Sequence, residues 1–266
     1  GPDRVRDLLA LGVPFDRTPD GALALSLEAA HSRPRVARVA GDLAGREIMA
    51  ALIRAARAAE TITVLEGVAV RTLLQDSHGN VRGVAGTGPD GQPVAFEASE
   101  TVLATGGTGG LFRVTTNPAQ ALGHGLAMAY RAGALIADPE FVQFHPTALD
   151  VGRDPAPLAT EALRGEGAFL VNDNGRRFMA AYHPDADLAP RDVVARAIAS
   201  EIRAGRGAFL DATQAVGAAF PSHFPTVFAA CEAAGIDPRV APMPIAPAAH
   251  YHMGGIAVDR HGRTSL

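Results

Sequence analysis

A β-rich run that ends in Thr-Gly-Gly-Thr-Gly-Gly at positions 105–110 sets strong limits on how this chain can fold. A strand that runs directly into successive glycines lets backbone approach a ligand without obstruction by Cβ atoms. In α/β sheets, ligands bind at strand ends of this kind. The alternative is a tight turn that binds nothing. The sequence contains no Gly-x-Gly-x-x-Gly motif that would decide between a ligand site and a turn. The most similar segment is Gly123-His124-Gly125.

Short β-rich segments separated by turn signals precede these glycines. They cover residues 61–65, 68–74, 81–84, 94–96 and 101–104. The turn sequences between them are His-Gly-Asn and Pro-Asp-Gly-Gln. Their close spacing predicts antiparallel hairpins rather than βαβ units.

Helices are predicted from apolar spacing at residues 42–60, 122–131, 190–203 and 224–234. The apolar residues that share one face of the first helix are Ile48, Met49, Leu52 and Ile53. Asp42 is suited to cap the start of that helix. The third begins Pro-Arg-Asp, and proline with a nearby acidic residue is typical of a helix start.

Composition excludes several classes of protein. The 266 residues carry a net charge of −4 and contain no basic stripe, which argues against a nucleic-acid partner. No apolar run approaches the ~20 residues that span a bilayer. All 24 basic residues are arginine, so chemistry that requires lysine is excluded. Cys231 is the single cysteine, which rules out an intrachain disulfide and fits a reducing cytoplasm.

Histidines form the first group of candidate site residues. Pro146 disfavours the α conformation at His145, so this imidazole is held in extended chain and can be aimed at a ligand. The alternative is a loop histidine with local hydrogen bonds. His250 and His252 would face one side of a strand. No acidic or cysteine ligand adjoins them, so no metal site is predicted.

The second group combines a carboxylate with guanidinium groups. Glu161 and Arg164 are spaced i, i+3 and would pair on a helical turn. The pair is either a solvated surface contact or part of a buried proton relay, and spacing does not distinguish them. Arg191 lies at a predicted helix start, where the helix dipole disfavours a cation. It either serves something other than the helix or is an exposed loop arginine.

Five segments occur in a fixed order. They read Thr-Val-Leu-Ala-Thr-Gly-Gly (101–107), Gln-Phe-His-Pro-Thr (143–147), Thr-Glu-Ala-Leu-Arg-Gly-Glu-Gly-Ala (160–168), Ala-Pro-Arg-Asp-Val-Val-Ala-Arg-Ala-Ile (189–198) and Pro-Ala-Ala-His-Tyr-His-Met-Gly-Gly (247–255). Together they resemble the succinate dehydrogenase/fumarate reductase flavoprotein family over essentially the whole chain. Thr-Glu-Ala-Leu-Arg, Pro-Ala-Ala-His-Tyr and Leu27-Glu28-Ala-Ala-His31-Ser32 are similar to the members that oxidise L-aspartate.

The resemblance implies an α/β fold, with a partial FAD-binding domain that contains an antiparallel β-meander and an α+β capping domain. The implied boundaries are 1–137 for the partial FAD-binding domain, 138–251 for the capping domain and 252–266 for the return to the first. Family members begin earlier and continue later than this sequence. The resemblance therefore implies a fragment that is inactive by itself, and it leaves open whether the fragment retains FAD.

The resemblance also implies roles for particular residues. Arg191 would handle the proton, with Glu161 and Arg164 as its relay partners. The residues implied to bind a dicarboxylate, L-aspartate or fumarate, are Glu28, His145, Thr160 and His250. Thr105, Gly106, Gly107 and His124 would contact FAD, although the family usually has aspartate where this chain has His124. Quinolinate synthase is the implied pathway partner, since iminoaspartate leads to quinolinate and NAD.

Two other functions remain open. One is a fumarate reductase or succinate dehydrogenase flavoprotein subunit, which would need an iron–sulfur partner. The other is a binding or structural module that performs no catalysis.

Overall fold

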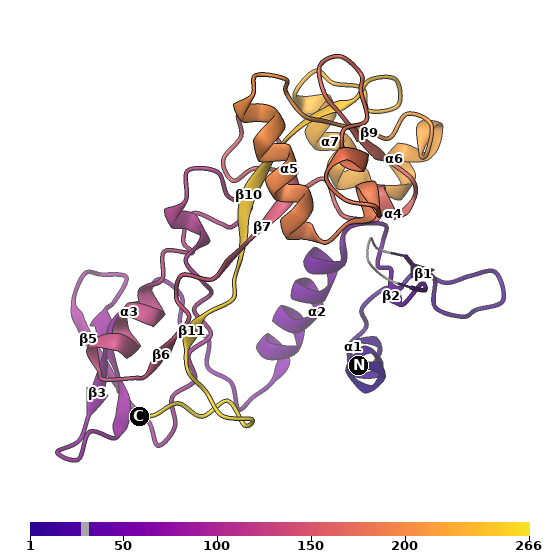
Figure 1. Cartoon of the computed structure of the whole chain (residues 1–266). Helices are drawn as coiled ribbons and strands as arrows, with labels where there is room; N and C mark the ends of the chain where they lie inside the picture. The colour runs from indigo at the N-terminus through magenta and orange to yellow at the C-terminus, as the bar shows by residue number, and fades with distance from the viewer. Residues whose placement is uncertain (28–31) are drawn as a thin grey trace. The chain divides into compact units, whose positions relative to one another are not determined.

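The computed structural model describes residues 1–27 and 32–266. These residues form two compact units, which are treated separately below (Figure 1). The first unit contains residues 1–63 and 144–248, and the second contains residues 64–143 and 249–266. Secondary structure is a mixture of helices and largely antiparallel sheets.

The first unit holds most of the helices. They are α1 (Pro2–Ala10), α2 (Ala44–Ala58), α4 (Ala162–Gly165), α5 (Arg191–Arg203), α6 (Phe220–His223) and α7 (Pro225–Ala233). Its short 3₁₀ turns are η2 (Met179–Ala181), η3 (Ala186–Leu188) and η4 (Gly217–Ala219). Its strands are β1 (Leu25–Ser26), β2 (Val36–Ala37), β8 (Phe169–Val171) and β9 (Phe209–Asp211), with most of β7 (Val142–Leu149) and β10 (Met243–His252).

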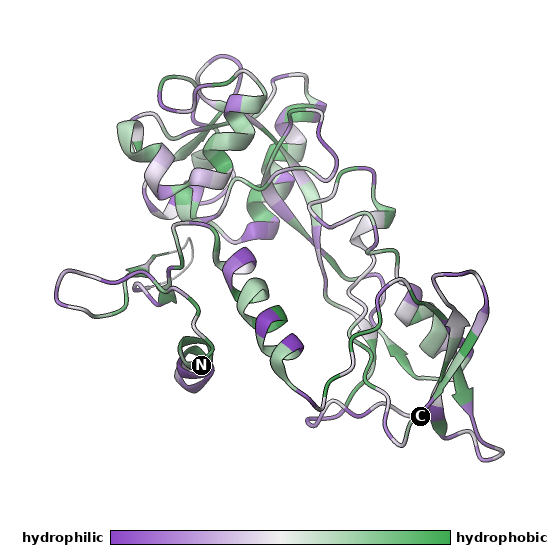
Figure 2. Ribbon diagram, turned by 180° about the vertical axis from the view of Figure 1, so that it is seen from behind, coloured by the Kyte–Doolittle hydropathy of each residue, from purple (hydrophilic) through white to green (hydrophobic). Residues whose placement is uncertain are grey.

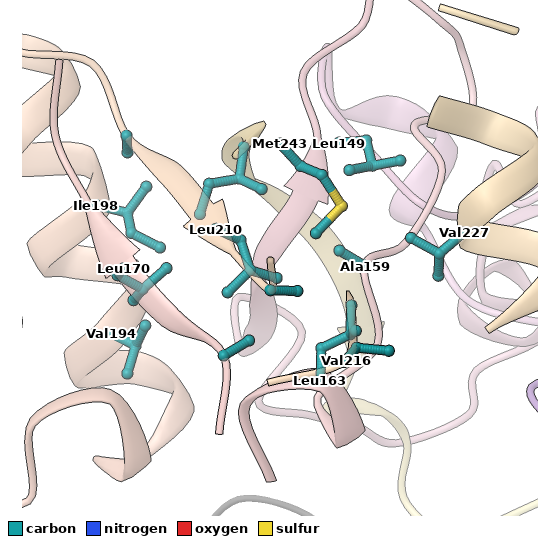
Figure 3. Close-up of a cluster of buried hydrophobic side chains, with 14 of the residues drawn as sticks. Leu149, Ala159, Leu163, Leu170, Val194, Ile198, Leu210, Val216, Val227 and Met243 are labelled. Carbon is teal, nitrogen blue, oxygen red and sulfur yellow. The ribbon is translucent and has the colours of Figure 1, made fainter. Parts of the chain in front are cut away.

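The main core lies on a four-stranded sheet of order β7-β10-β9-β8. Leu210 on β9 is opposite both Leu170 on β8 and Met243 on β10, and all three are fully buried. Cross-strand neighbours share one face of a sheet, so the three side chains form a continuous apolar row. Figure 3 shows Val194 and Ile198 in the same cluster.

Helix α5 is positioned by its apolar stripe. Val194, Ala197 and Ile198 are spaced i, i+3, i+4 and are all buried in the main core. Truncating one such aliphatic side chain to alanine typically costs about 2–5 kcal/mol. The first residue of the helix, Arg191, is therefore held in place by the packing of the turns that follow it.

Segments before residue 63 form a smaller cluster, in which Val13, Val39 and Ala51 are buried and Ile48 packs against them. The helix predicted over 42–60 forms as α2, and Figure 2 shows hydrophobic and hydrophilic residues alternating along it. The large apolar residues of α2 that remain exposed are Met49, Leu52 and Ile53. The apolar face predicted for α2 is therefore only partly buried.

Asp42 does not cap α2, contrary to the sequence expectation. Its carboxylate instead accepts hydrogen bonds from the backbone N–H groups of Thr226 and Val227 in the first turn of α7. The first turns of α2 and α7 both offer backbone N–H groups that lack partners within the helix. The fold brings the start of α7, which is distant in the sequence, within reach of the Asp42 carboxylate.

The second unit contains the predicted meander. Its elements are β3 (Ala69–Gln75), β4 (Val81–Thr87), β5 (Pro93–Glu97), η1 (Gly109–Leu111), α3 (His124–Arg131), β6 (Ile136–Ala137) and β11 (Gly255–Ile256). Strands β3, β4 and β5 pair in that order and antiparallel, as the hairpin spacing predicts. A two-stranded sheet joins β6 to β11.

Two predicted strands do not form among the described residues. Residues 61–65 and 101–104 have no ladder partner, and Val102 is 88% exposed. Their β-branched residues favour extended chain, but a strand also requires a neighbour for its backbone hydrogen bonds. The remaining predicted helices form as α3, α5 and α7. No helix in the described part of the chain combines the length and apolar character that a bilayer crossing requires.

A buried polar network ties the end of α5 to the loop after β8. Glu201 accepts two hydrogen bonds of 2.8 Å from the Arg206 guanidinium, one of 2.9 Å from the Tyr182 hydroxyl and one of 3.3 Å from the Asn172 amide. These donors lower the pKa of Glu201 to about 2, with Arg206 the largest contributor. Ionised Glu201 therefore stabilises the folded state.

Glu201→Gln should lower the melting temperature at neutral pH, because charge-assisted hydrogen bonds each contribute roughly 1.5–3 kcal/mol. The folded pKa is depressed, so the wild-type advantage is present above the unfolded pKa near 4.5 and declines as pH falls towards about 2. Melting curves of both proteins over this range test the trend. The exposed Glu60→Gln is the control and should show no such pH-dependent difference.

Candidate functional site

In the first unit, Glu161 receives hydrogen bonds from two arginines. Arg164 donates from Nη2 to Oε1 at 3.0 Å, and Arg191 donates from Nε to Oε2 at 2.6 Å. Arg191 Nη2 forms an additional ion pair with Oε2. Glu161 is the residue that precedes α4, Arg164 lies three residues on, and Arg191 is the first residue of α5. Two helix starts thus place one carboxylate between two guanidinium groups.

The ion pair expected between Glu161 and Arg164 forms, and the exposed fractions of its side chains exclude one of the two interpretations. The side chains of Arg164 and Glu161 are 0% and 7% exposed, whereas that of Arg191 is 31% exposed. The pair is therefore no solvated surface contact. Only the Arg191 end of the group is open to solvent or to a ligand.

Burial also changes the acidity of this group. Desolvation lowers the pKa of the Arg164 guanidinium from its ordinary value, and the positive charge of Arg191 acts in the same direction. The carboxylates of Glu161 and Asp187 oppose this effect. The Nε of Arg164 is buried without a hydrogen-bond acceptor among the described residues. A guanidinium in this setting gives up a proton more readily than one in water.

Asp187 was not predicted from the sequence. Its backbone carbonyl accepts a 2.7 Å hydrogen bond from Arg164 Nη1, and its carboxylate accepts one of 2.7 Å from Arg177. An acidic residue shortly before the Pro-Arg-Asp helix start is the available signal, but Asp185 fits that pattern equally well. Only the fold separates the two, since Asp187 is buried and Asp185 is exposed.

Strand β7, which carries His145, runs beside the segment that leads to Thr160. His145 is 1% exposed, and its Nδ1 accepts a 3.2 Å hydrogen bond from the Thr147 backbone N–H. Thr147 exchanges backbone and side-chain hydrogen bonds with Ala159, so the segment before Glu161 runs beside the strand that carries His145. Thr160 is half-buried, and its Oγ1 accepts from Ala162 N–H.

In the second unit, the two histidines of β10 have different partners. His250 Nδ1 lies 2.6 Å from Thr116 Oγ1, and Asn117 donates to the His250 carbonyl. His252 Nε2 donates to the carbonyl of Pro139 at 2.9 Å. Across the described residues, no group of three potential metal ligands occurs.

A pocket of about 710 Å³ lies within the second unit. The strand-like residues 101–104 line it together with Thr105, Gly106 and Gly107, and residues 252 and 254–256 complete one side. Its volume is in the range of small-molecule and cofactor sites. The structure thus places all three predicted residues of the glycine run on one cavity.

Glycines in and beside this pocket are favoured for two different reasons, a left-handed backbone conformation or close approach of a neighbouring residue. Gly106 has φ +71°, a conformation that side chains disfavour, and the position of its Cβ is open. A Cβ on Gly107 would lie 2.8 Å from the Cβ of His252. A Cβ on Gly125 would overlap the Thr105 side chain. Such a glycine-lined cavity fits a flat, polar cofactor that contacts backbone.

Two predicted site residues are not found at these sites for different reasons. His124 is exposed at the first residue of α3 and is absent from the lining of this pocket. Glu28 lies outside the described residues.

Comparison with known proteins agrees with these features. The sequence profile of a family described as "FAD binding domain" matches residues 1–266. The chain belongs to this family, the flavoproteins that include succinate dehydrogenase and fumarate reductase. FAD is the cofactor that this membership indicates, and the glycine-lined pocket of the second unit fits it.

Two similar sequences are both named L-aspartate oxidase. One from Caulobacter vibrioides is 64% identical over 100% of this chain and 52% of its own length. One from Mesorhizobium japonicum is 53% identical over 100% of this chain and 51% of its own length. The chain spans about half the length of these curated relatives.

Among solved structures, a quinol-fumarate reductase determined with menaquinol molecules matches with a TM-score of 0.89. It is 32% identical in sequence, and the match covers 99% of this chain and 48% of that one. The mixed α/β fold class inferred from the sequence is therefore confirmed.

Gly125→Ala should weaken FAD binding roughly tenfold, about 1.4 kcal/mol, because the added methyl group displaces Thr105 at the pocket wall. Helix propensity acts in the opposite sense by up to ~1 kcal/mol, whereas overpacking costs about 1–3 kcal/mol. Flavin fluorescence titration measures the affinity. Gly45→Ala, where nothing lies within 4 Å, is the control. Wild-type affinity in Gly125→Ala would show that the close approach is unimportant.

Proposed function

We propose that this chain is part of an enzyme that oxidises L-aspartate to iminoaspartate with FAD, using oxygen or fumarate as final acceptor. The main support for the proposal is the Arg191–Glu161–Arg164 group, in which Glu161 and Arg164 are buried, in a chain of an FAD-binding family. Two relatives over 50% identical along the whole chain are named for this activity.

The reaction requires a hydride and a proton to leave the substrate. L-aspartate loses the hydride from Cα and a proton from its ammonium group, which leaves the C=N bond of iminoaspartate. When bound, FAD supplies the hydride acceptor. In the fumarate direction, one carbon of fumarate receives a hydride and the other receives a proton, which gives succinate.

Arg191 is the proton donor in the fumarate direction. Its N–H bond breaks as the C–H bond forms. The Glu161 carboxylate, hydrogen-bonded to both guanidinium groups, then accepts a proton from Arg164 and gives one to Arg191, and Arg164 must be reprotonated before the next turnover. Arginine has a pKa above ~12 in water and is a poor acid there. Proton transfer from it therefore depends on relay partners and on removal from solvent, which the burial of Glu161 and Arg164 supplies.

A dicarboxylate substrate needs cations and hydrogen-bond donors for two carboxylates. We assign this role to His145, Thr160 and Arg191 of the first unit. His250 belongs to the second unit, and its imidazole is also assigned to carboxylate binding. Glu28 is assigned to the substrate ammonium group, which a carboxylate recognises by a charge-assisted hydrogen bond. Thr105, Gly106, Gly107 and His124 are assigned to FAD.

We assign residues 138–251 to a capping domain and the flanking residues, 1–137 and 252–266, to the FAD-binding domain. The product fits the first step of NAD synthesis, and quinolinate synthase is the enzyme that would consume it. The lone Cys231, whose thiol pKa burial raises to about 11, fits a reducing cytoplasm.

A fumarate reductase flavoprotein subunit is the second candidate. The TM-score of 0.89 to the quinol-fumarate reductase favours it. The two candidates differ in whether the substrate amine is recognised, and oxidation of L-aspartate by the purified FAD-loaded full chain separates them.

In the complete FAD-loaded enzyme of which this chain is part, Arg191→Leu should reduce fumarate reduction to less than a tenth of the wild-type kcat, a loss above ~1.4 kcal/mol. Flavin content should be unchanged, because the glycine-lined pocket belongs to the second unit. Arg196→Leu, an exposed arginine on the same helix, is the matched control. A mutant that retains most of its kcat would disprove the proton-donor role.

Glu28→Gln should weaken kcat/KM for L-aspartate roughly tenfold or more, because the ammonium group loses its charged partner. Fumarate reduction should be nearly intact, since fumarate has no amine. Steady-state kinetics with both substrates test this. Equal losses with both would mean that Glu28 acts on the fold or on a carboxylate contact.

A further inference from the structure

Within the second unit, the segment 114–117 is attached to the end of β10. Thr115 forms a parallel bridge with Ala249, and both residues are buried. The Thr115 hydroxyl donates to the Ala249 carbonyl at 3.0 Å, and the Ala249 N–H donates to the Val114 carbonyl at 2.9 Å. These bonds fix the backbone of β10 immediately before His250.

Asn117 extends the attachment to His250 itself. Its side-chain amide donates to the His250 carbonyl at 2.8 Å, and its backbone N–H donates to the Thr115 hydroxyl at 3.0 Å. A Cβ on Gly109 would lie 2.4 Å from the carboxamide carbon of Asn117. The absence of a side chain at position 109 therefore leaves room for the amide that holds the His250 backbone.

The imidazole of His250 is held from the same segment. Thr116 Oγ1 lies 2.6 Å from His250 Nδ1, and both residues are half-buried. Among the contacts of the described residues, Nδ1 is the one hydrogen-bond partner of this hydroxyl. If Nδ1 donated, the hydroxyl hydrogen would have no acceptor among those residues. If Nδ1 accepts, the hydroxyl hydrogen is satisfied, and the proton of a neutral ring is on Nε2.

This tautomer is the one that suits a carboxylate ligand. A neutral imidazole binds a carboxylate only through its N–H group, because its other ring nitrogen carries a lone pair and repels carboxylate oxygens. With Nδ1 accepting from Thr116, that N–H group is at Nε2.

We propose that Thr116 is a positioning residue for substrate binding, which holds His250 in the tautomer that donates from Nε2 to a substrate carboxylate. This inference rests on the proposed function, in which His250 binds a dicarboxylate.

The backbone attachment of the segment does not depend on the Thr116 hydroxyl. The Thr116 N–H donates to the Ala249 carbonyl at 3.1 Å, and the bonds of Thr115 and Asn117 use other groups. Valine at position 116 keeps the branched shape and removes the hydroxyl. Thr116→Val should therefore leave the backbone in place and change only the hydrogen bonding of the imidazole.

Long-range proton–nitrogen NMR measures the tautomer of His250 in the complete FAD-loaded enzyme of which this chain is part. The spectra are taken well above the ordinary imidazole pKa, where the ring is neutral, and His250→Leu assigns the signals. The wild type should carry its proton on Nε2, Thr116→Val should show a mixture of tautomers, and Thr116→Ser should restore the wild-type signals. A wild-type proton on Nδ1, or an unchanged spectrum in Thr116→Val, would overturn the proposal. The wild-type spectrum decides even if Thr116→Val does not fold.

Steady-state kinetics of fumarate reduction test the consequence for binding. Thr116→Val should raise KM roughly three- to tenfold with kcat changed less than about twofold, because a binding interaction is lost and the proton relay is untouched. Thr116→Ser should restore most of the wild-type KM. Thr72→Val, at an exposed threonine on β3 of the same unit, is the matched control and should change neither KM nor the tautomer. An unchanged KM in Thr116→Val, or a loss confined to kcat, would contradict the positioning role.

His250→Leu separates the two possible failures. This substitution removes both ring nitrogens and should raise KM for fumarate more than Thr116→Val does. If His250→Leu has the wild-type KM, the proposed carboxylate-binding function of His250 is wrong. If His250→Leu raises KM while Thr116→Val does not, only the role of Thr116 is wrong.

Discussion

The first unit depends on the placement of one carboxylate, Glu161, between two guanidinium groups. Charges at this depth are tolerated only when they are paired and hydrogen-bonded, so the helix starts that carry them cannot shift independently. Arg164 is joined to Asp187, and Asp187 is joined to β8. The chemistry of the group and the positions of α4, η3 and α5 are therefore set by the same few contacts.

The apolar core supplies the rigidity that such a charge group needs. The row of Leu170, Leu210 and Met243 across three strands holds β8 next to β9 and β10, and α5 packs by its Val194 and Ile198 side chains into the same cluster. The helix that starts with Arg191 and the strand that anchors η3 therefore share one core. Close packing of this kind restricts side-chain movement, because displaced atoms lose dispersion contacts.

The second unit contains a pocket at which glycines leave backbone atoms accessible to a ligand. Its meander and α3 frame a pocket whose wall contains Gly106 and Gly107, and side chains at Gly107 or Gly125 would meet neighbouring atoms. Membership of an FAD-binding family is consistent with our proposal that the glycine run contacts FAD. Glycine permits close contact at Gly107 and a left-handed backbone conformation at Gly106.

Local spacing and contiguous motifs were enough to predict the helices α2, α3, α5 and α7, the meander, the family and the pairing of Glu161 with Arg164. The burial of this pair, the capping of α7 rather than α2 by Asp42, and the entry of Asp187 rather than Asp185 into the charge cluster emerged only from the folded chain. Residues 101–104 were predicted as a strand for the same kind of reason and do not form one. Their β-branched residues favour extended chain, but the local sequence does not determine whether a neighbouring strand is present to pair with them. Burial, capping and charge balance all depend on residues far apart in the chain, and local spacing contains no information about which of them meet.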